Sequence, residues 1–439
     1  MASTAAVEDR TYLRFLIAGL ALALGGGFVL AVMAPLSATG VLPFQDRTHL
    51  LIQAHAFAQL LGFAGVIVAG MALRLIPRFA GVAPPDARLA GLALALLGSS
   101  ALGRIVVQPW LEGTAGDLGM LASGFAGSAG MVLVAVLLWS TVRRARKPAE
   151  PWRDFVRAGI AWWLVWAIFS AAAAVEAAGN DRFVPLRLED AVAWIAMLGV
   201  IGSFVWAVQS RSVAVFFGRK PRTRRQTIIP LVLFNGGLAL VVLSVPMAEG
   251  SMSWRTEGLG LALAGVSMLW LAPAVGAVWG HAERLRPRAR PAARYIIVAN
   301  LAAASAGALL IWAGLTTLLS GEYQAFWARD AARHLVALGT ITMLIVGMAQ
   351  LVAPVFALER GGSRRARIRD EAMFWFLTAA LVTRAAAGLL EEWSGYESRM
   401  NHSAYAGMLA WIGLALFAWR LASAIRREPE MKDLLGVPR

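Results

Sequence analysis

The sequence contains no cysteine, and only 15% of its 439 residues are charged. The lack of thiols excludes disulfides, iron–sulfur ligation, thiolate metal sites and the C-x-x-C-H attachment of c-type haem. Any redox group must therefore be held by histidine or by packing. Hydrophobic residues make up 59% of the chain, whereas soluble domains have about 45–50% apolar and about 25% charged residues. This balance predicts an all-α protein embedded in the lipid bilayer.

Twelve apolar runs are long enough to cross a membrane, which takes about 20 residues. Short charged or Pro/Gly-containing stretches separate them, so we expect one integral membrane domain over residues 1–439. The predicted spans are 13–36, 49–73, 89–109, 118–142, 155–178, 190–213, 227–247, 257–280, 294–319, 331–356, 371–390 and 403–425. The first run follows charged residues and is long enough to span, which favours a signal anchor over a cleaved signal peptide.

The basic residues predict the orientation of the spans. With the N-terminus placed in the cytoplasm, 32 of the 41 Lys and Arg fall in cytoplasmic segments, seven in outer loops and two inside spans. Lys and Arg concentrate on the cytoplasmic side of membrane proteins, so the sequence predicts that both termini are cytoplasmic. The net charge of +15 is explained by this distribution, and it does not indicate binding to nucleic acid.

The sequence also predicts an internal repeat of four helices. Residues 70–81 (GMALRLIPRFAG) match residues 347–358 (GMAQLVAPVFAL) at an offset of 277, and residues 211–218 (RSVAVFFG) match part of the first segment at an offset of 137. The three segments end spans two, six and ten. Near-equal spacing predicts three pseudo-repeats, approximately 1–145, 146–285 and 286–439, as internal repeats are common in large membrane proteins.

Two of the five histidines lie well inside predicted spans, and His49 is the first residue of span two. His281 and His402 are near span ends and are interpreted as interfacial. His55 and His334 lie in spans two and ten, 15 and 13 residues before the matched glycines of the repeat, so their depths differ by about 3 Å at 1.5 Å per residue. An intramembrane histidine is costly without a partner and is therefore a candidate functional residue.

His55 and His334 could hold one metal centre between them. The alternative is a structural role, with each ring hydrogen-bonded to nearby backbone or to Gln53 and Gln59. His49 is six residues from His55, which places it about 240° around the helix. It is a candidate for a second metal near the surface, and it cannot share the face of His55.

The stretches 49–81 (HLLIQAHAFAQLLGFAGVIVAGMALRLIPRFAG) and 333–354 (RHLVALGTITMLIVGMAQLVAP) carry a resemblance to a known family. They resemble the NnrS family, haem- and copper-containing membrane proteins linked to nitric oxide stress. More remotely they resemble subunit I of the haem-copper oxidases, whose twelve helices form three pseudo-repeats of four. The resemblance implies a bacterial inner membrane protein.

The resemblance implies that His55 and His334 ligate one low-spin haem b, because oxidase helices two and ten carry the ligands of that haem. The position of the oxidase ligand to the high-spin haem is Ala332 here. Residues 181–280 contain no histidine, so the copper ligands of oxidase helices six and seven have no counterpart. The His-x-His-Glu pattern of NnrS-like proteins is replaced by His-Ala-Phe-Ala from position 55. These departures argue against copper and oxygen reduction.

Three arginines border the two histidine helices on the outer side. Haem propionates need cationic partners, and Arg47, Arg329 and Arg333 are the candidates. The alternative is that they are interfacial anchors paired with Asp46 and Asp330.

Arg104 and Arg384 are the basic residues deep inside spans. An arginine there must face the bundle interior and meet carbonyls or a carboxylate. They are interpreted either as clamps between repeats or as an anion or propionate site.

Two classes of function fit this sequence. The first is a haem protein that transfers electrons, exchanged with a redox partner protein or quinol, or that handles a small gas such as nitric oxide. The second is a cofactor-free transporter of a small anion, with Arg104 and Arg384 along the path. A structural subunit of a larger membrane complex is a third interpretation. An absorption spectrum separates the first from the others.

Overall fold

The structure, a computed structural model, describes residues 10–148, 150–218, 220–274, 290–352, 364–389 and 391–434. These residues are helical, without a strand among them. Twelve helical stretches within them are long and apolar enough to span a membrane, and each overlaps one predicted span. His281 and the predicted span ends at 275–280, 353–356 and 390 lie outside the described residues.

The first four spans are built from eight helical elements joined end to end or by short loops, with a 3₁₀ turn before the second span. Their bounds are α1 (Thr11–Leu22), η1 (Ala23–Gly27) and α2 (Phe28–Ala38); η2 (Gln45–Arg47), α3 (Thr48–Phe57), η3 (Ala58–Gly65) and α4 (Val66–Ala80); α5 (Ala87–Trp110); and α6 (Gly113–Arg143).

The remaining eight spans follow the same order along the chain. Their bounds are α7 (Trp152–Ala178); α8 (Leu186–Trp194), η4 (Ile195–Gly202), α9 (Ser203–Val208), η5 (Gln209–Val213) and α10 (Ala214–Phe216); α11 (Arg224–Ser244); α12 (Ser251–Ala274); α13 (Arg290–Ser320); α14 (Phe326–His334), η8 (Leu335–Thr342) and α15 (Met343–Val352); α16 (Arg364–Leu389); and α17 (Glu391–Leu434), which bends at Gly395.

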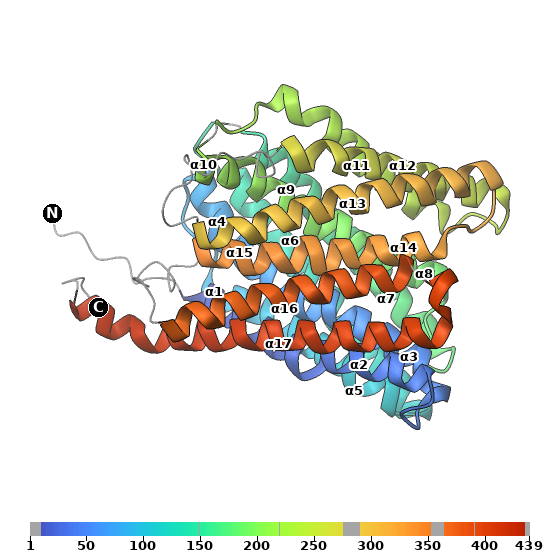
Figure 1. The fold of residues 1–439 in the computed structure, drawn as a ribbon. Coiled ribbons are helices and arrows are strands. Elements are labelled where there is room, and N and C mark those ends of the chain that lie inside the picture. Colours follow the sequence, from blue (N-terminus) through green and yellow to red (C-terminus); the bar gives the residue numbers. More distant parts are fainter. Residues whose placement is uncertain are drawn as a thin grey trace.

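The helices lie roughly parallel, and α14 and α15 run between α13 and α16 (Figure 1). Spans two, six and ten form the centre, because 78%, 83% and 78% of their most apolar windows are buried, against 61% or less in the other spans. Each central span contains an eight-residue π-helix, η3, η4 or η8, and the three π-helices pack against one another. They begin at residues 58, 195 and 335, intervals close to the repeat predicted from the sequence.

A glycine occupies the fifth position of each central π-helix, at Gly62, Gly199 and Gly339. A Cβ added at Gly339 would lie 2.5 Å from the Cβ of Ala302, and one at Gly199 would lie 2.8 Å from the indole ring of Trp162. Such distances are shorter than van der Waals contact. Small residues at these positions therefore let neighbouring helices approach closely, as is common in membranes.

Ion pairs join the predicted cytoplasmic loops to one another. Arg211 lies 3.0 Å from Glu150, and Arg224 lies 2.8 Å from Asp154. The loop after span four and the loop after span six therefore lie at the same end of the bundle. The last helix, α17, also ends at the end of the bundle where α1 begins (Figure 1). This agrees with an even number of spans.

Candidate functional site

His55 lies in the last turn of α3, just before η3. Its Nδ1 lies 2.8 Å from the backbone oxygen of Gly27 in the first span. A carbonyl oxygen can only accept a hydrogen bond, so Nδ1 is the protonated nitrogen of this ring. In a neutral imidazole the other nitrogen then carries the lone pair. The Nε2 of His55 is therefore available as an acceptor or metal ligand.

His334 has the same arrangement in the tenth span. Its Nδ1 lies 2.8 Å from the backbone oxygen of Asp330, one turn earlier in α14, and 3.4 Å from the Asp330 carboxylate. Its Nε2 is thus also the nitrogen with the lone pair. The side chain is 26% exposed although it lies inside a membrane span, and His55 is likewise only half-buried. The two rings are close enough to interact electrostatically.

The carbonyl that holds His55 belongs to a π-helix. Gly27 is the last residue of η1, and a second carbonyl of η1, that of Leu24, accepts a hydrogen bond of 2.9 Å from the indole of Trp411 in α17. π-Helices are rare and often occur at functional sites. Here the irregular turn of the first span binds one side chain from span two and one from span twelve.

Arg384 in α16 binds the residue that orients His334. Its two terminal nitrogens lie 2.8 and 3.0 Å from the two carboxylate oxygens of Asp330, which is a bidentate contact. The Arg384 and Asp330 side chains are 16% and 17% exposed. The Arg384 charge also lies within electrostatic range of both His55 and His334. Span eleven is therefore part of the histidine site.

Arg333, the neighbour of His334, bridges to the sixth span. It lies 2.7 Å from the carboxylate of Asp190 in α8, and its guanidinium lies 5.1 Å from the ring centre of Trp194. Tyr323, in the loop before α14, lies within electrostatic range of both Arg333 and Asp190, and burial raises its pKa. The end of the site next to the loop before α14 is thus lined with charged and polar groups.

Arg104 in α5 lies in a buried polar network near the same end. Its Nε donates to Gln108 at 2.5 Å, and its Nη2 lies 3.8 Å from Glu189 without a hydrogen bond. Gln108 in turn donates to Gln53 at 2.9 Å, and Gln53 binds both backbone groups of Val184. The network joins spans two, three and six through groups that would be costly to bury alone.

The other predicted site residues contact partners other than the histidine pair. Arg47 binds Glu112 at 2.7 Å and the backbone of Pro109, and Arg329 is fully buried against Glu257. His49 is exposed, with its ring 5.2 Å from that of Phe183. Among the described residues, no group of three or more His, Asp or Glu side chains could hold a metal ion.

Two members of the site were not recognised in the sequence. Asp330 was considered only as a partner of the bordering arginines, but it binds Arg384 and His334 instead. Its spacing of four residues from His334 is a helical-face signal that could have identified it. The backbone oxygen of Gly27 gives no such signal, because it depends on the π-helical turn.

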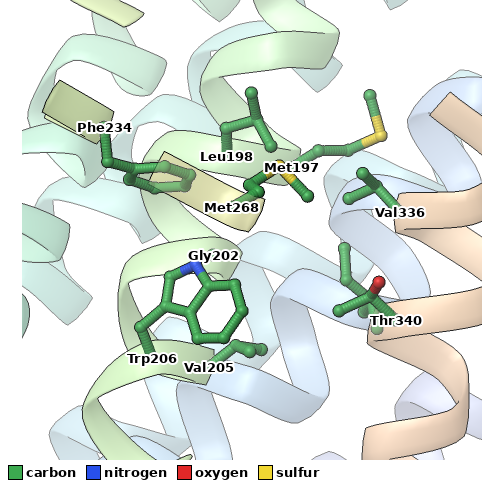
Figure 2. A pocket seen from close by; sticks show the side chains of 10 residues that line it. Met197, Leu198, Gly202, Val205, Trp206, Phe234, Met268, Val336 and Thr340 are labelled. Carbon is green, nitrogen blue, oxygen red and sulfur yellow. The ribbon is translucent and has the colours of Figure 1, made fainter. Parts of the chain in front are cut away.

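The space between η4 and η8 is filled by side chains. Figure 2 shows Met197, Trp206, Phe234, Met268 and Val336 converging there from spans six, seven, eight and ten. They leave a cavity of about 10 Å³, which is close to the minimum for one water molecule. The described side chains that line it are apolar except for the Thr340 hydroxyl and the Trp206 indole N–H, so they offer a metal neither imidazole nor carboxylate.

Comparison with known proteins agrees with this architecture. The family model described as NnrS protein matches residues 13–428, nearly the full chain. None of the curated proteins matches the sequence. The match covers all twelve spans and every residue of the histidine site. The chain therefore belongs to the NnrS family of membrane proteins.

Proposed function

We propose that this protein binds one haem b between its second and tenth spans, with His55 and His334 as the axial ligands. The observation that carries the proposal is the hydrogen bonding of the two rings. Both Nδ1 atoms donate to backbone carbonyls at 2.8 Å, and metal-bound histidines commonly donate their other ring nitrogen in this way. The two Nε2 atoms are thus oriented by the protein, and each carries a lone pair that can bind iron.

The residues around the pair fit a haem in charge and in polarity. Arg333 and Arg384 are the cations next to His334 and Asp330, and carboxylates such as propionates form strong hydrogen bonds with arginine. Arg384 takes the role that the sequence suggested for Arg329, because its charge lies within electrostatic range of both histidines, whereas Arg329 is fully buried against Glu257. Arg47 binds Glu112 and is not needed in this proposal.

A bound haem supplies an iron that can change its oxidation state by one electron. The protein would contribute rigidity: carbonyls fix both imidazoles, and the Asp330–Arg384 pair fixes the turn that bears His334. Because both axial positions would be filled by imidazole, this arrangement favours electron transfer over gas binding at the iron. We propose that the electrons are exchanged with a redox partner protein or quinol in the bacterial inner membrane, in a role linked to nitric oxide.

The absorption spectrum of the purified protein tests this proposal. After expression with ample haem, we expect a low-spin, six-coordinate spectrum and haem that extracts into acidified acetone. His55→Ala and His334→Ala should each lose the haem or become high-spin. His402→Ala is the matched control, because His402 is exposed and its ring contacts Ser398 on its own helix. Protein without a Soret band would overturn the proposal, and a spectrum unchanged in both variants would refute the site.

One observation favours the alternative, a transporter of a small anion. The Arg104 side chain is 2% exposed, and within the described part of the chain its Nη2 has no hydrogen bond. A buried donor of this kind could bind an anion that passes between spans three and six. Uptake of a labelled anion into proteoliposomes, lost in Arg104→Gln but not in His55→Ala, would support transport over haem binding.

A further inference from the structure

A second cavity lies on the side of the three central π-helices away from the histidines. It has a volume of about 90 Å³ and lies between α4 of span two, α9 and η5 of span six, and α15 of span ten. Side chains such as Ile67, Phe204 and Leu344, which are at most 4% exposed, form its walls. The cavity is therefore built into the centre of the bundle.

The lining of this cavity is poorly suited to water. A buried water molecule needs two to four polar partners, and Gln209 is the one polar side chain among the described residues that line the cavity. The volume is several times the roughly 10–15 Å³ that a single water requires. Engineered apolar cavities of comparable character stay dry and bind xenon or small apolar molecules. Size and lining thus favour a small molecule of low polarity.

The amide nitrogen of Gln209 is a hydrogen-bond donor without a partner among the described residues. Asn300 donates through Nδ2 both to the backbone oxygen of Ile296 at 2.8 Å and to Gln209 Oε1 at 2.9 Å. Because these two contacts fix the amide orientations, the oxygen of Gln209 faces Asn300 and its Nε2 does not. The Gln209 side chain is 1% exposed, and its Nε2 finds no hydrogen-bond partner among the described residues. A buried unpaired donor is costly and would be satisfied by a weak acceptor in the cavity.

We propose that this cavity is a docking site for a diatomic gas of low polarity, the class to which nitric oxide belongs. The apolar walls bind the molecule by dispersion, and Gln209 Nε2 donates a weak hydrogen bond to it. Such gases concentrate in the bilayer, where the cavity lies. The choice of nitric oxide among these gases rests on the proposed function, whereas the affinity for a gas rests on the cavity alone.

Xenon NMR on the full-length protein in lipid nanodiscs tests the proposal without requiring haem. Wild-type protein should shift the xenon resonance in proportion to its concentration. Ala72→Leu and Ala349→Leu place extra methyl groups in the cavity and should abolish the protein-specific shift. Ala172→Leu adds the same volume on the exposed face of α7 and should leave the shift unchanged. An unchanged shift in both filled variants would overturn the proposal.

Met348→Ala keeps the test decisive if the filled variants fold poorly. It enlarges the cavity and should increase the xenon shift, so a shift that stays at the wild-type value would count against the proposal. If the purified protein lacks haem but binds xenon in this way, the haem proposal fails and the gas site stands. If the purified protein instead shows the haem spectrum but no xenon shift, the gas-site proposal fails and the haem proposal stands.

Competition by nitric oxide tests the role of Gln209. Under anaerobic conditions nitric oxide should displace xenon from the wild-type protein. Gln209→Met removes the donor and should weaken this displacement about twofold or more, while xenon binding persists. Leu344→Met changes an apolar wall of the same cavity, nearly conserves volume and keeps the Gln209 donor, so displacement should remain at the wild-type level. Equal displacement in both variants would exclude the hydrogen bond, and no displacement in wild type would exclude nitric oxide.

Discussion

Both terminal nitrogens of Arg384 contact the carboxylate of Asp330, at 2.8 and 3.0 Å, one helical turn before His334. A partly buried arginine from span eleven therefore fixes the turn of span ten that presents the candidate haem ligand. The contact is bidentate, the geometry in which arginine and carboxylate interact most strongly.

Arg384→Met should destabilise the protein by about 3 kcal/mol, because it leaves the Asp330 charge without its partner in a low-dielectric environment. The double variant Asp330→Asn/Arg384→Met should be more stable than Arg384→Met alone, since both charges are removed. Thermal unfolding in detergent measures each difference. If the loss of stability in the double variant equals the sum of the losses in Asp330→Asn and Arg384→Met, the two residues are not coupled.

The same pair should influence the potential of a haem bound by His334. Asp330→Asn removes a negative charge near the ligand and should raise the midpoint potential, whereas Arg384→Met should lower it. Each change should be on the order of 50 mV, equivalent to about 1 kcal/mol for one electron. Spectroelectrochemical titration measures the potentials, with His402→Ala as the control. Shifts of the same sign in the two variants would contradict this electrostatic account.

The glycines of the central π-helices should not tolerate a methyl group. At Gly339 an added Cβ would lie 2.5 Å from the Cβ of Ala302, so Gly339→Ala should cost about 1–3 kcal/mol through overpacking. Gly236 in α11 is the control, because a Cβ there would meet no atom within 4 Å. Gly236→Ala should be neutral or stabilising by up to about 1 kcal/mol. Equal melting temperatures for the two variants would refute the close packing of η8.

Cysteine labelling tests the predicted orientation, and the natural absence of cysteine provides a clean background. Arg364→Cys, at the start of α16, should be shielded from impermeant thiol reagents in intact cells and react after lysis. Glu322→Cys is exposed in the loop after α13 and should react in intact cells. Gly395, with a φ of 75°, is a poorer choice because a cysteine there would strain the backbone. If Arg364→Cys reacts in intact cells and Glu322→Cys is shielded, the predicted orientation is wrong.

The sequence was sufficient to predict the twelve spans, because each depends on a local run of apolar residues. It was also sufficient to single out His55 and His334, since an intramembrane histidine is rare and costly. The pairing of Asp330 with Arg384 was missed because the two residues are 54 positions apart. The π-helices were missed because apolar periodicity does not distinguish them from ordinary α-helices in buried spans. The Gly27 oxygen could be identified as the partner of His55 only once the π-helical turn η1 was known.

The hydrogen bond from Trp411 to the Leu24 carbonyl joins residues 387 positions apart. At a synthesis rate of about 5–20 residues per second, roughly 20–80 s separate the appearance of the two partners. The first span must wait in the membrane for this period before its irregular turn can acquire the contact. The turn η1, which orients His55, is therefore among the last parts of the bundle to complete its contacts during biogenesis. A chain truncated before span twelve should lack the hydrogen bond from Trp411 to this turn.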